Sequence, residues 1–566
     1  MPNHTHQVLL SISLITLLLV SLVAIWGLPT KRLRGWLVGL AVLDFIWVVP
    51  VILLFPPDRN SFWDWFFDSA AELTANAILS AAQLMLVGWC ALFLAWRGGP
   101  KPVWQRVYWL ILAALFIFLS IDEFFSVHES FRWWRLTYAF TGAGILFGGI
   151  ALWWRSDKTQ KKLTVLFLIG FGLMGFAGVF MDAVSNEGSI GPIPALCHQR
   201  SFGVACQAYG TLEEYFELLG AALMLFSLLA TINARIAGAS LRRIRYGLAS
   251  IGGLWVFVMI GSTWIFPTIT GYLFASPMRA DYLNGNLSLV RGHISPAVLH
   301  PGDTLDVTLY TRVNDFMPLD YSMSVGLVSR PWGENNIGHD DMTLGNFEYP
   351  TYGWIPGLLV ANSFHLPIPD DVPTPSSYRL VVSVWQGDPG NAFPVERQEN
   401  LSLFDPTRLV LIDIPILSRD STPPPPVTTD YRFNPGFSLT GYDLPETMTT
   451  GTTLDVRFWW ETQTAIDAQM THFLHFIRVD TGEQFDFNQQ PFDGTFPTTD
   501  WPAALNVVDA WTITLPVDMP PGEYRVHTGM FMTDSANADR VPVSDANGQP
   551  IQDYSIVLAT VTVRAP

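Results

Sequence analysis

The chain has 566 residues, of which 49% are hydrophobic and 14% are charged, with a formal net charge of −17. The acidic, lysine-free sequence beyond residue 278 argues against nucleic acid or anionic lipid as a partner of that part. Residues 279–566 contain 14 Arg, no Lys and 35 Asp or Glu, a net −21, which leaves +4 for residues 1–278. The chain therefore has two parts of different character.

Hydrophobic stretches dominate the first part, and eight of them are long enough to cross a bilayer as helices. They cover approximately residues 7–27, 36–56, 73–96, 107–127, 136–154, 163–183, 211–232 and 248–274. The sequence therefore predicts a polytopic transmembrane domain over residues 1–277.

Basic residues are concentrated in alternate connections between these stretches. Four connections contain 14 Lys and Arg, at residues 31–34, 97–106, 155–162 and 235–245. By the positive-inside rule these connections are cytoplasmic, which places the N- and C-termini outside. The opening MPNHTH lacks a basic region and no small-residue cleavage site follows, so the first stretch is expected to be retained as a helix rather than cleaved as a signal peptide.

The chain has three cysteines, and two of them, Cys197 and Cys206, lie in one predicted outward loop. A disulfide between them requires an oxidising compartment, so it agrees with the topology derived from charge. Two free thiols are the alternative. Cys90 falls within a predicted membrane helix, where it is expected to act as a small packing residue.

The acidic residues of the membrane part gather at one end of its predicted helices. Asp122, Glu123, His128 and Glu129 end the fourth stretch, Asp182 ends the sixth, and Glu213, Glu214 and Glu217 open the seventh. Ionisable groups at membrane depth are costly, so their convergence predicts a functional site. Several carboxylates together repel one another unless a cation neutralises them, which indicates a bound divalent metal.

The residue types suggest a role for each member of this acidic group. The expected metal ligands are Asp122, His128, Glu129, Asp182, Glu213 and Glu217. A mixed carboxylate and imidazole set suits zinc, manganese or iron, and Glu123 or Glu214 would be the catalytic general base for a metal-activated water. The alternative is that these acids are hydrated helix ends, where Glu also complements the helix dipole. Asp44, in the middle of the second stretch, is expected to be neutral or hydrogen-bonded to a neighbouring helix.

Beyond residue 278 no apolar run of helix length remains. The sequence instead has short alternating stretches, such as TLDVTLYTRV and TLDVRFWWE, punctuated by Pro and Gly. This pattern is typical of antiparallel β-sandwiches. We expect two tandem all-β, Ig-like extracytoplasmic domains at residues 278–417 and 430–566, joined by a stiff Pro-rich linker at residues 418–429.

An internal repeat indicates that the two β domains are copies of one module. YPTYGW (residues 349–354) recurs as FPTTDW (residues 496–501), and PGDTLDVTLY recurs as TGTTLDVRFW. Self-similarity at a period of domain length implies two copies of one fold. Tryptophans such as Trp354 and Trp501 raise a carbohydrate-binding hypothesis, but their repetition favours a structural role in each core.

These motifs resemble known proteins in both parts of the chain. PGDTL, aromatic-Pro-Thr-x-x-Trp and LP-x-D-x-PPG-x-Y resemble the β-sandwich module appended to bacterial envelope membrane proteins, some membrane glycosyltransferases included. The membrane part is similar to uncharacterised bacterial polytopic membrane proteins with D-E-x4-H-E at the end of a helix and E-E-x2-E at the start of a later one. Those motifs are Asp122, Glu123, His128, Glu129 and Glu213, Glu214, Glu217 here. The resemblance implies a place in the bacterial cytoplasmic membrane and no particular activity.

Three classes of function follow from these features. The first is a metal-dependent hydrolase or transferase that acts at the outer leaflet on membrane lipid, or on a lipid-linked or cell-envelope glycan. The second is a non-catalytic membrane anchor that displays two binding β-sandwich modules. The third is a cation or proton transporter that uses Asp44 and the outer carboxylates.

Overall fold

The computed structural model describes residues 2–48, 65–66, 73–97, 102–125, 134–181, 203–235, 239–330, 336–345, 349–399, 401–434 and 436–566. The chain forms two compact units. The first unit is Met1–Leu273 with Arg312–Asp320 and Leu344–Val360, and the second is Phe274–Thr311, Tyr321–Thr343 and Ala361–Pro566.

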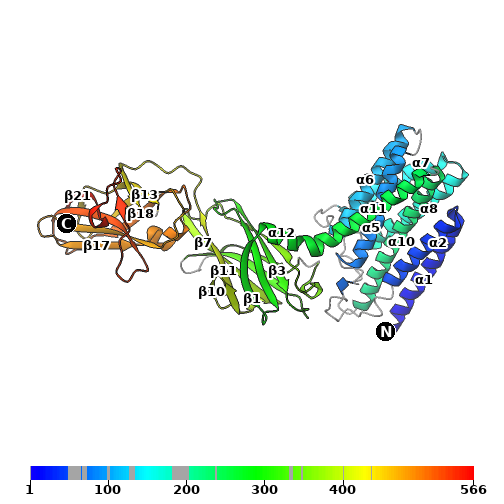
Figure 1. The fold of residues 1–566 in the computed structure, drawn as a ribbon, viewed down its shortest axis with the longest axis horizontal. Helices are drawn as coiled ribbons and strands as arrows, with labels where there is room; N and C mark the ends of the chain where they lie inside the picture. Colours follow the sequence, from blue (N-terminus) through cyan, green and yellow to red (C-terminus); the bar gives the residue numbers. More distant parts are fainter. Residues whose placement is uncertain are drawn as a thin grey trace. The chain divides into compact units, whose positions relative to one another are not determined.

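The first unit is built mainly from helices that lie side by side (Figure 1). They are α1 (Pro2–Gly27), α2 (Lys31–Val48), α5 (Ala75–Arg97), α6 (Val103–Phe125), α7 (Trp134–Trp154), α8 (Lys158–Gly175), the π-helical η2 (Phe176–Met181), α10 (Gly203–Arg235), α11 (Ala239–Ile260), the π-helical η4 (Gly261–Ile265) and α12 (Phe266–Phe274). α10 is the central helix, because it packs against α1, α2, α5 and α8. Most of its apolar stretch is buried.

Six of the described helices are long and apolar enough to cross a membrane, so the prediction of eight spans is wrong in number. They are Val8–Gly27, Ala75–Trp96, Val103–Phe125, Lys158–Met181, Tyr209–Arg235 and Arg242–Phe274. Helices also form at the two remaining predicted positions, as α2 and α7. However, α2 has three basic residues in its first turn and an aspartate further on, and four glycines and two threonines dilute the apolar character of α7. The described helices are those of a multi-pass membrane protein.

The cysteine predictions have different outcomes. Cys90 is a buried free thiol within the core formed by α5, α6, α8 and α10, which confirms its packing role. Cys197 and the side chain of Cys206 lie outside the described residues. Their disulfide therefore stays a prediction, and the part of the chain that the structure describes contains no disulfide.

The C-terminal region forms four β-sheets. The first β module (residues 276–416) contains β1 (Ser276–Tyr282), β2 (Leu287–Ser295), β3 (Thr304–Val313), β4 (Ser322–Ser329), β5 (Asn336–Thr343), η5 (Thr351–Gly353), β6 (Val360–Pro367), β7 (Ser376–Gln386), β8 (Asp388–Ala392), β9 (Arg397–Glu399), β10 (Ser402–Asp405) and β11 (Arg408–Ile416). The second β module (residues 427–564) contains β12 (Val427–Phe433), β13 (Phe437–Asp443), β14 (Thr447–Thr449), β15 (Thr453–Thr462), β16 (Met470–Arg478), β17 (Gln484–Gln489), η6 (Pro491–Gly494), η7 (Thr498–Asp500), β18 (Asn506–Thr514), β19 (Gly522–Met532), β20 (Val543–Ser544), η8 (Gln552–Tyr554) and β21 (Ile556–Arg564).

The two modules share one topology. One sheet runs β6-β3-β2-β1-β9 in the first module and β18-β15-β13-β12-β20 in the second. The other runs β11-β7-β4-β5 and β21-β19-β16-β17, respectively. In the second module both sheets contribute side chains to a single buried core. The strands that the sequence repeat matches, β3 and β15, occupy the same place in the two orders, as expected for two copies of one fold.

The aromatic-Pro-Thr-x-x-Trp motif forms the same turn in both modules, and we call residues 349–354 and 496–501 the first and second corner. The indole N–H of Trp354 donates to the carbonyl of Tyr349 at 2.7 Å, and that of Trp501 donates to Phe496 at 3.2 Å. Both tryptophans are 1% exposed. The structural interpretation of these residues is confirmed, and neither ring is available to stack on a carbohydrate.

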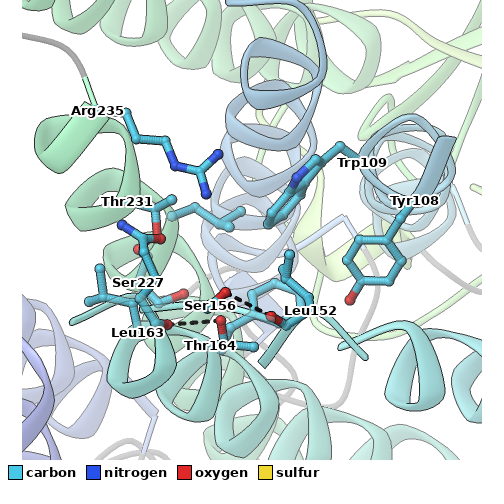
Figure 2. Close-up of a pocket in the computed structure, with 12 residues that line it drawn as sticks. Tyr108, Trp109, Leu152, Ser156, Leu163, Thr164, Ser227, Thr231 and Arg235 are labelled. Atoms are coloured by element: carbon cyan, nitrogen blue, oxygen red, sulfur yellow. Dashed lines mark hydrogen bonds between the residues drawn. The ribbon is translucent and has the colours of Figure 1, made fainter. Parts of the chain in front are cut away.

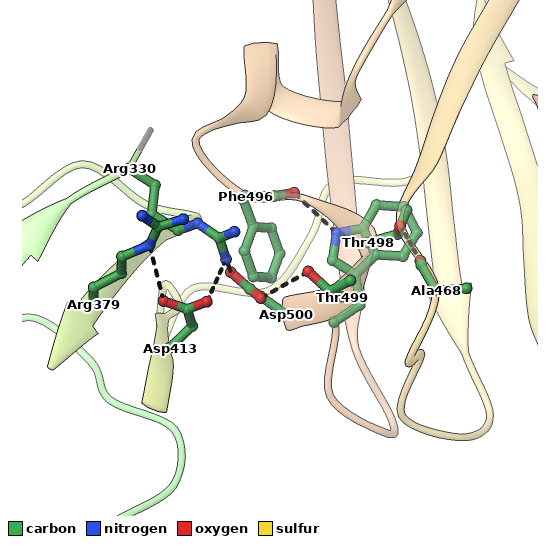
Figure 3. Close-up of polar contacts among 9 residues, drawn as sticks. Arg330, Arg379, Asp413, Ala468, Phe496, Thr498, Thr499 and Asp500 are labelled. Atoms are coloured by element: carbon green, nitrogen blue, oxygen red, sulfur yellow. Dashed lines mark hydrogen bonds and ion pairs between the residues drawn. The ribbon is translucent and has the colours of Figure 1, made fainter. Parts of the chain in front are cut away.

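Each corner contacts a segment that precedes it in the chain. In the first corner a Cβ at Gly353 would lie 2.8 Å from the ring of Trp65, so a side chain does not fit there. The equivalent residue of the second corner, Asp500, pairs at 2.6 Å with Arg330 of the first module (Figure 3). Arg330 also pairs with Asp413 at 2.7 Å, and burial raises the pKa of that carboxyl. One guanidinium thus joins two carboxylates from different modules.

His472 is a fully buried histidine in the core of the second module. Its Nε2 lies 2.6 Å from the hydroxyl of Thr528, which donates its own hydrogen to the carbonyl of Phe473. Nε2 must therefore carry a hydrogen, and burial disfavours the charged form of the ring. The ring lies among Phe458, Trp460 and Trp511, at centroid distances of 4.3, 5.1 and 4.6 Å. Burial lowers the pKa of His472 to about 3.

This histidine is expected to make the second module sensitive to acid. The unfolded chain binds a proton at His472 below about pH 6.5 and the folded chain does not, so stability falls as the pH drops below 6.5. Between pH 7 and 5 the loss is about 2 kcal/mol. Burial raises the pKa of Asp509 to about 6, and this acid partly offsets the loss. The variant His472→Leu should therefore gain about 2 kcal/mol relative to the native chain over this pH range.

Hydrogen exchange of the β16 and β19 amides at both pH values measures this difference. His365→Leu, a substitution in β6 of the first module, is the control and should leave the exchange of the β16 and β19 amides unchanged. The prediction would be contradicted if the stability derived from amide exchange changed equally with pH in the native chain and in the His472→Leu variant.

Candidate metal centre

Three glutamates from two helices converge in the first unit. Glu123 lies in the last turn of α6, whereas Glu214 and Glu217 lie on α10. One carboxylate oxygen from each lies within 4.8 Å of the others, and all three side chains are half-buried. Two full negative charges at this separation repel by about 3 kcal/mol at an effective dielectric constant of about 20. The group, which we call the glutamate cluster, therefore favours a cation or bound protons.

Polar side chains of neighbouring helices hold the carboxylates of this region. The Asn76 amide, in the first turn of α5, donates to Glu214 at 2.7 Å. The hydroxyl of Tyr138 on α7 donates to Asp122 at 2.5 Å. Asn76 and Asp122 are 2% and 4% exposed, so these contacts are shielded from water. Such outer partners orient metal-binding carboxylates and increase metal affinity.

A glycine of η2, Gly178, leaves room for the carboxylate of Glu217. A Cβ at Gly178 would overlap Oε1 of Glu217. η2 is π-helical, a conformation that occurs mostly as short segments and frequently at functional sites. A side chain at residue 178 would force the Glu217 carboxylate to shift.

The structure brings together some of the residues that the sequence singled out. Glu217, predicted as a ligand, joins Glu123 and Glu214, which were predicted as general bases. Asp122 lies beside Glu123 and contacts Tyr138, whereas Glu213 is half-buried outside the cluster. His128, Glu129 and Asp182 lie outside the described residues. The roles assigned to all these residues stay predictions.

The donor set decides which metals suit the described cluster. All of its ligand atoms are carboxylate oxygens, which suit manganese, magnesium and calcium. Of zinc, manganese and iron, manganese fits this set best, since zinc and iron sites usually include nitrogen or sulfur ligands. Sequence reasoning missed Asn76, Tyr138 and Gly178. The polar amide of Asn76 in a mostly apolar helix was an available signal for that residue.

A second acid lies deeper in the helix bundle. Asp44 on α2 is fully buried and accepts a hydrogen bond from Gln83 of α5 at 3.4 Å, as its expected pairing with a neighbouring helix requires. Its other carboxylate oxygen has no hydrogen-bond partner among the described residues. Asn76 and Gln83 are seven residues apart and share one face of α5. This face therefore contacts both Glu214 and Asp44.

A comparison with protein families places this site within one known domain. Residues 39–232 match DUF8692, a domain of unknown function. The DUF8692 match includes the glutamate cluster, Asn76, Asp44 and Gln83, and it ends before α11. A comparison with curated proteins finds no match. DUF8692 thus defines a region of the chain and supplies no chemistry.

Proposed function

We propose that this protein is a metal-dependent membrane enzyme, a hydrolase or transferase that acts on a lipid or lipid-linked substrate. The observation that carries the proposal is the convergence of Glu123, Glu214 and Glu217. A divalent cation held there would lower the pKa of a bound water and polarise a substrate oxygen. A glutamate that does not bind the metal directly would accept the proton from that water.

The place of the cluster in the helices supports a substrate from the bilayer. Glu123 ends α6 and Glu214 lies in the first half of α10, so the cluster is near one membrane boundary. The basic residues of these helices, Arg106 and Arg235, lie at the opposite ends. By the positive-inside rule those ends are cytoplasmic, and the cluster therefore faces the outer leaflet.

We also propose that the two β modules are extracytoplasmic β-sandwich domains. Their strand order and lysine-free, acidic sequence support this assignment. Contact with a cell-envelope glycan would not use Trp354, Trp501 or Trp511, because each is 1% exposed. A non-catalytic anchor that displays these modules is the competing function. Full biological activity of the modules on an unrelated membrane anchor would favour it.

The experiment that tests the enzyme is metal analysis combined with lipid turnover. Full-length protein purified in detergent should contain or take up close to one manganese ion per chain. Incubated with a bacterial lipid extract, the loaded protein should form a product that a chelator prevents, as detected by mass spectrometry. Protein that takes up no divalent metal, or product that forms equally with chelator, would rule out this mechanism.

A second candidate function, proton or cation transport, is favoured by the buried pair of Asp44 and Gln83. A carboxyl group buried within a membrane bundle is a typical element of a proton path. In liposomes that contain the full-length protein, flux should be lost in the Asp44→Asn variant. It should persist in Asp157→Asn, which removes an acid at an exposed helix cap. Flux that is absent from the native protein would exclude transport.

A further inference from the structure

The helical unit contains a small pocket among α6, α7, α8 and α10 (Figure 2). It has room for about one water molecule. Ser227 and Thr231 of its lining donate their hydroxyl hydrogens to carbonyls of their own helix, and Arg235 interacts electrostatically with Asp157. A larger ligand, such as a sugar, does not fit this pocket and needs a more open surface. The second β module has such a surface.

The sheet β21-β19-β16-β17 of the second module turns one face to the core and the other outward. Leu474 and Phe476 of β16 lie in the core, and side chains alternate between the two faces of a strand. His475 and its cross-strand partner on β19, His527, therefore lie on the outer face. Asp486 of β17 lies opposite His475 on its other side. We call Asp486, His475 and His527 the histidine row, which crosses three neighbouring strands.

Two arginines border the histidine row. Arg525 precedes His527 by two residues on β19 and therefore shares its face. The guanidinium of Arg540 is held in place, because it lies over the Phe473 ring at 4.9 Å and donates to the carbonyl of Asp553 at 2.9 Å. Neither arginine makes an ion pair with an acid of the described residues. Two positive charges thus lie beside the row without an acid in direct contact.

These charges act on both histidines. Burial lowers the pKa of His527, and the nearby positive charges of Arg525, His475 and Arg540 lower it further. Burial also lowers the pKa of His475, where Arg540 adds to the effect and Asp486 opposes it. Both rings are therefore mostly neutral at pH 7. An anion bound beside them would offset the charges of the arginines.

The first module shows that the fold itself does not require a histidine at this place. The sequence SYRLVV of β7 aligns with EYRVHT of β19, so that Val381 takes the place of His527. Val381 packs there with Val328 and Val410 in a small buried apolar cluster. The outer face of the second module therefore differs from its copy by polar and charged groups.

The equivalent arginines of the two copies also differ in their partners. Arg379 of β7 lies opposite Asp413 of β11 and pairs with it at 3.5 Å. The equivalent Arg525 lies opposite Thr560 of β21. Since a threonine stands where the first copy has an acid, the charge of Arg525 is available to an anion from outside the chain.

The surrounding charges restrict the kind of anion. Residues 430–566 contain 6 Arg, no Lys and 18 Asp or Glu, so a densely charged polymer would be repelled. The side chain of Asp486 is 51% exposed; it also repels a second negative charge, but it accepts hydrogen bonds from hydroxyl groups. At about 4.8 Å per strand, β17 and β19 are about 10 Å apart. The face thus fits a ligand with one carboxylate and, about 10 Å away, hydroxyl groups.

We propose that the outer face of the second module binds an acidic sugar, a uronic acid linked to a neutral sugar in a cell-envelope glycan. Arg525 and Arg540, whose charges both act on His527, bind the carboxylate. Asp486 accepts hydrogen bonds from the hydroxyl groups of the neighbouring sugar. This site is separate from the glutamate cluster and does not rest on the proposed enzyme.

The test is titration calorimetry of the full-length protein in detergent with three probes. They are an aldobiuronic acid, which joins one uronic acid to one neutral sugar, the corresponding neutral disaccharide, and acetate. The aldobiuronic acid should bind at least about tenfold more tightly than either of the others. Arg525→Gln and Arg540→Gln should each weaken its binding about tenfold, as expected for the loss of a charge-assisted hydrogen bond.

Arg457→Gln is the matched control. It removes an exposed arginine of the same module from β15, in the opposite sheet, and should change the affinity less than about twofold. Arg525 is exposed, so its replacement tests the site even if Arg540→Gln disturbs the fold.

Four results would overturn the proposal. Equal binding of the two disaccharides would show that the carboxylate plays no part, and equal binding of acetate would identify a site for free carboxylate ions. Equal losses in the Arg525→Gln and Arg457→Gln variants would show that only the overall charge of the module matters. Binding of none of the probes would exclude the site.

Discussion

Glu217→Gln is expected to lower the affinity of the full-length protein for Mn²⁺ about 100-fold or more. The substitution keeps the volume of the side chain beside Gly178 and removes one of three converging charges. Removal of a residue that only hydrogen-bonds to a metal ligand lowers metal affinity about 10–100-fold. Removal of a charged ligand should therefore lower the affinity at least as much. Calorimetric titration of the detergent-purified protein measures this change, with metal content as a second readout.

The neighbouring acid Glu213 supplies the matched control. Glu213→Gln removes an equal charge from the same turn of α10 but from outside the cluster, so it should change the affinity less than about threefold. Equal losses in the two variants would mean that the metal responds only to the general negative charge of this region. The glutamate cluster would then not be the binding site.

Trp501→Ala is expected to destabilise the second β module by about 3–5 kcal/mol, the usual range for removal of a buried large aromatic side chain. The ring is 1% exposed and packs against Phe437, Trp460 and Phe496 at centroid distances of 5.9, 6.0 and 6.3 Å. The substitution also removes the hydrogen bond to the Phe496 carbonyl. A change of this size is a large part of the stability of a typical domain.

Hydrogen exchange with mass spectrometry of the full-length protein localises this effect. Peptides of β16 and β19 should exchange faster, whereas peptides of β4 and β7 in the first module should change little. Trp354→Ala is the matched variant and should reverse the pattern. A uniform effect of both variants over both modules would show that the modules unfold together, contrary to the expectation of separate cores.

The β part of the fold is largely predictable from the sequence, because its pattern is local. The alternation in TLDVTLYTRV reappears as alternating burial along β3, and the repeated corners identify the two copies before any contact is known. The number of membrane helices is less predictable. In α2 and α7 charges, glycines and threonines compete with apolar residues within a single stretch.

The sequence alone does not predict which glutamates form the cluster. Spacing places Glu213, Glu214 and Glu217 on neighbouring positions of one helix, but it does not tell which of them face α6. That choice depends on packing between helices. Asn76 and Glu214 are 138 residues apart, and Gly178 acts only through its closeness to Glu217. Such contacts leave no periodic signal in the chain.

The two corners use equivalent positions for different contacts. Position five of the motif is adapted to its neighbour, a glycine against the Trp65 ring and an aspartate, Asp500, against Arg330. Arg478, at the end of β16, takes the place in the second copy that Arg330 holds after β4. Its guanidinium is already engaged by Asp480, its own near neighbour. The same arginine position thus joins two modules in the first copy and holds a neighbouring turn in the second copy.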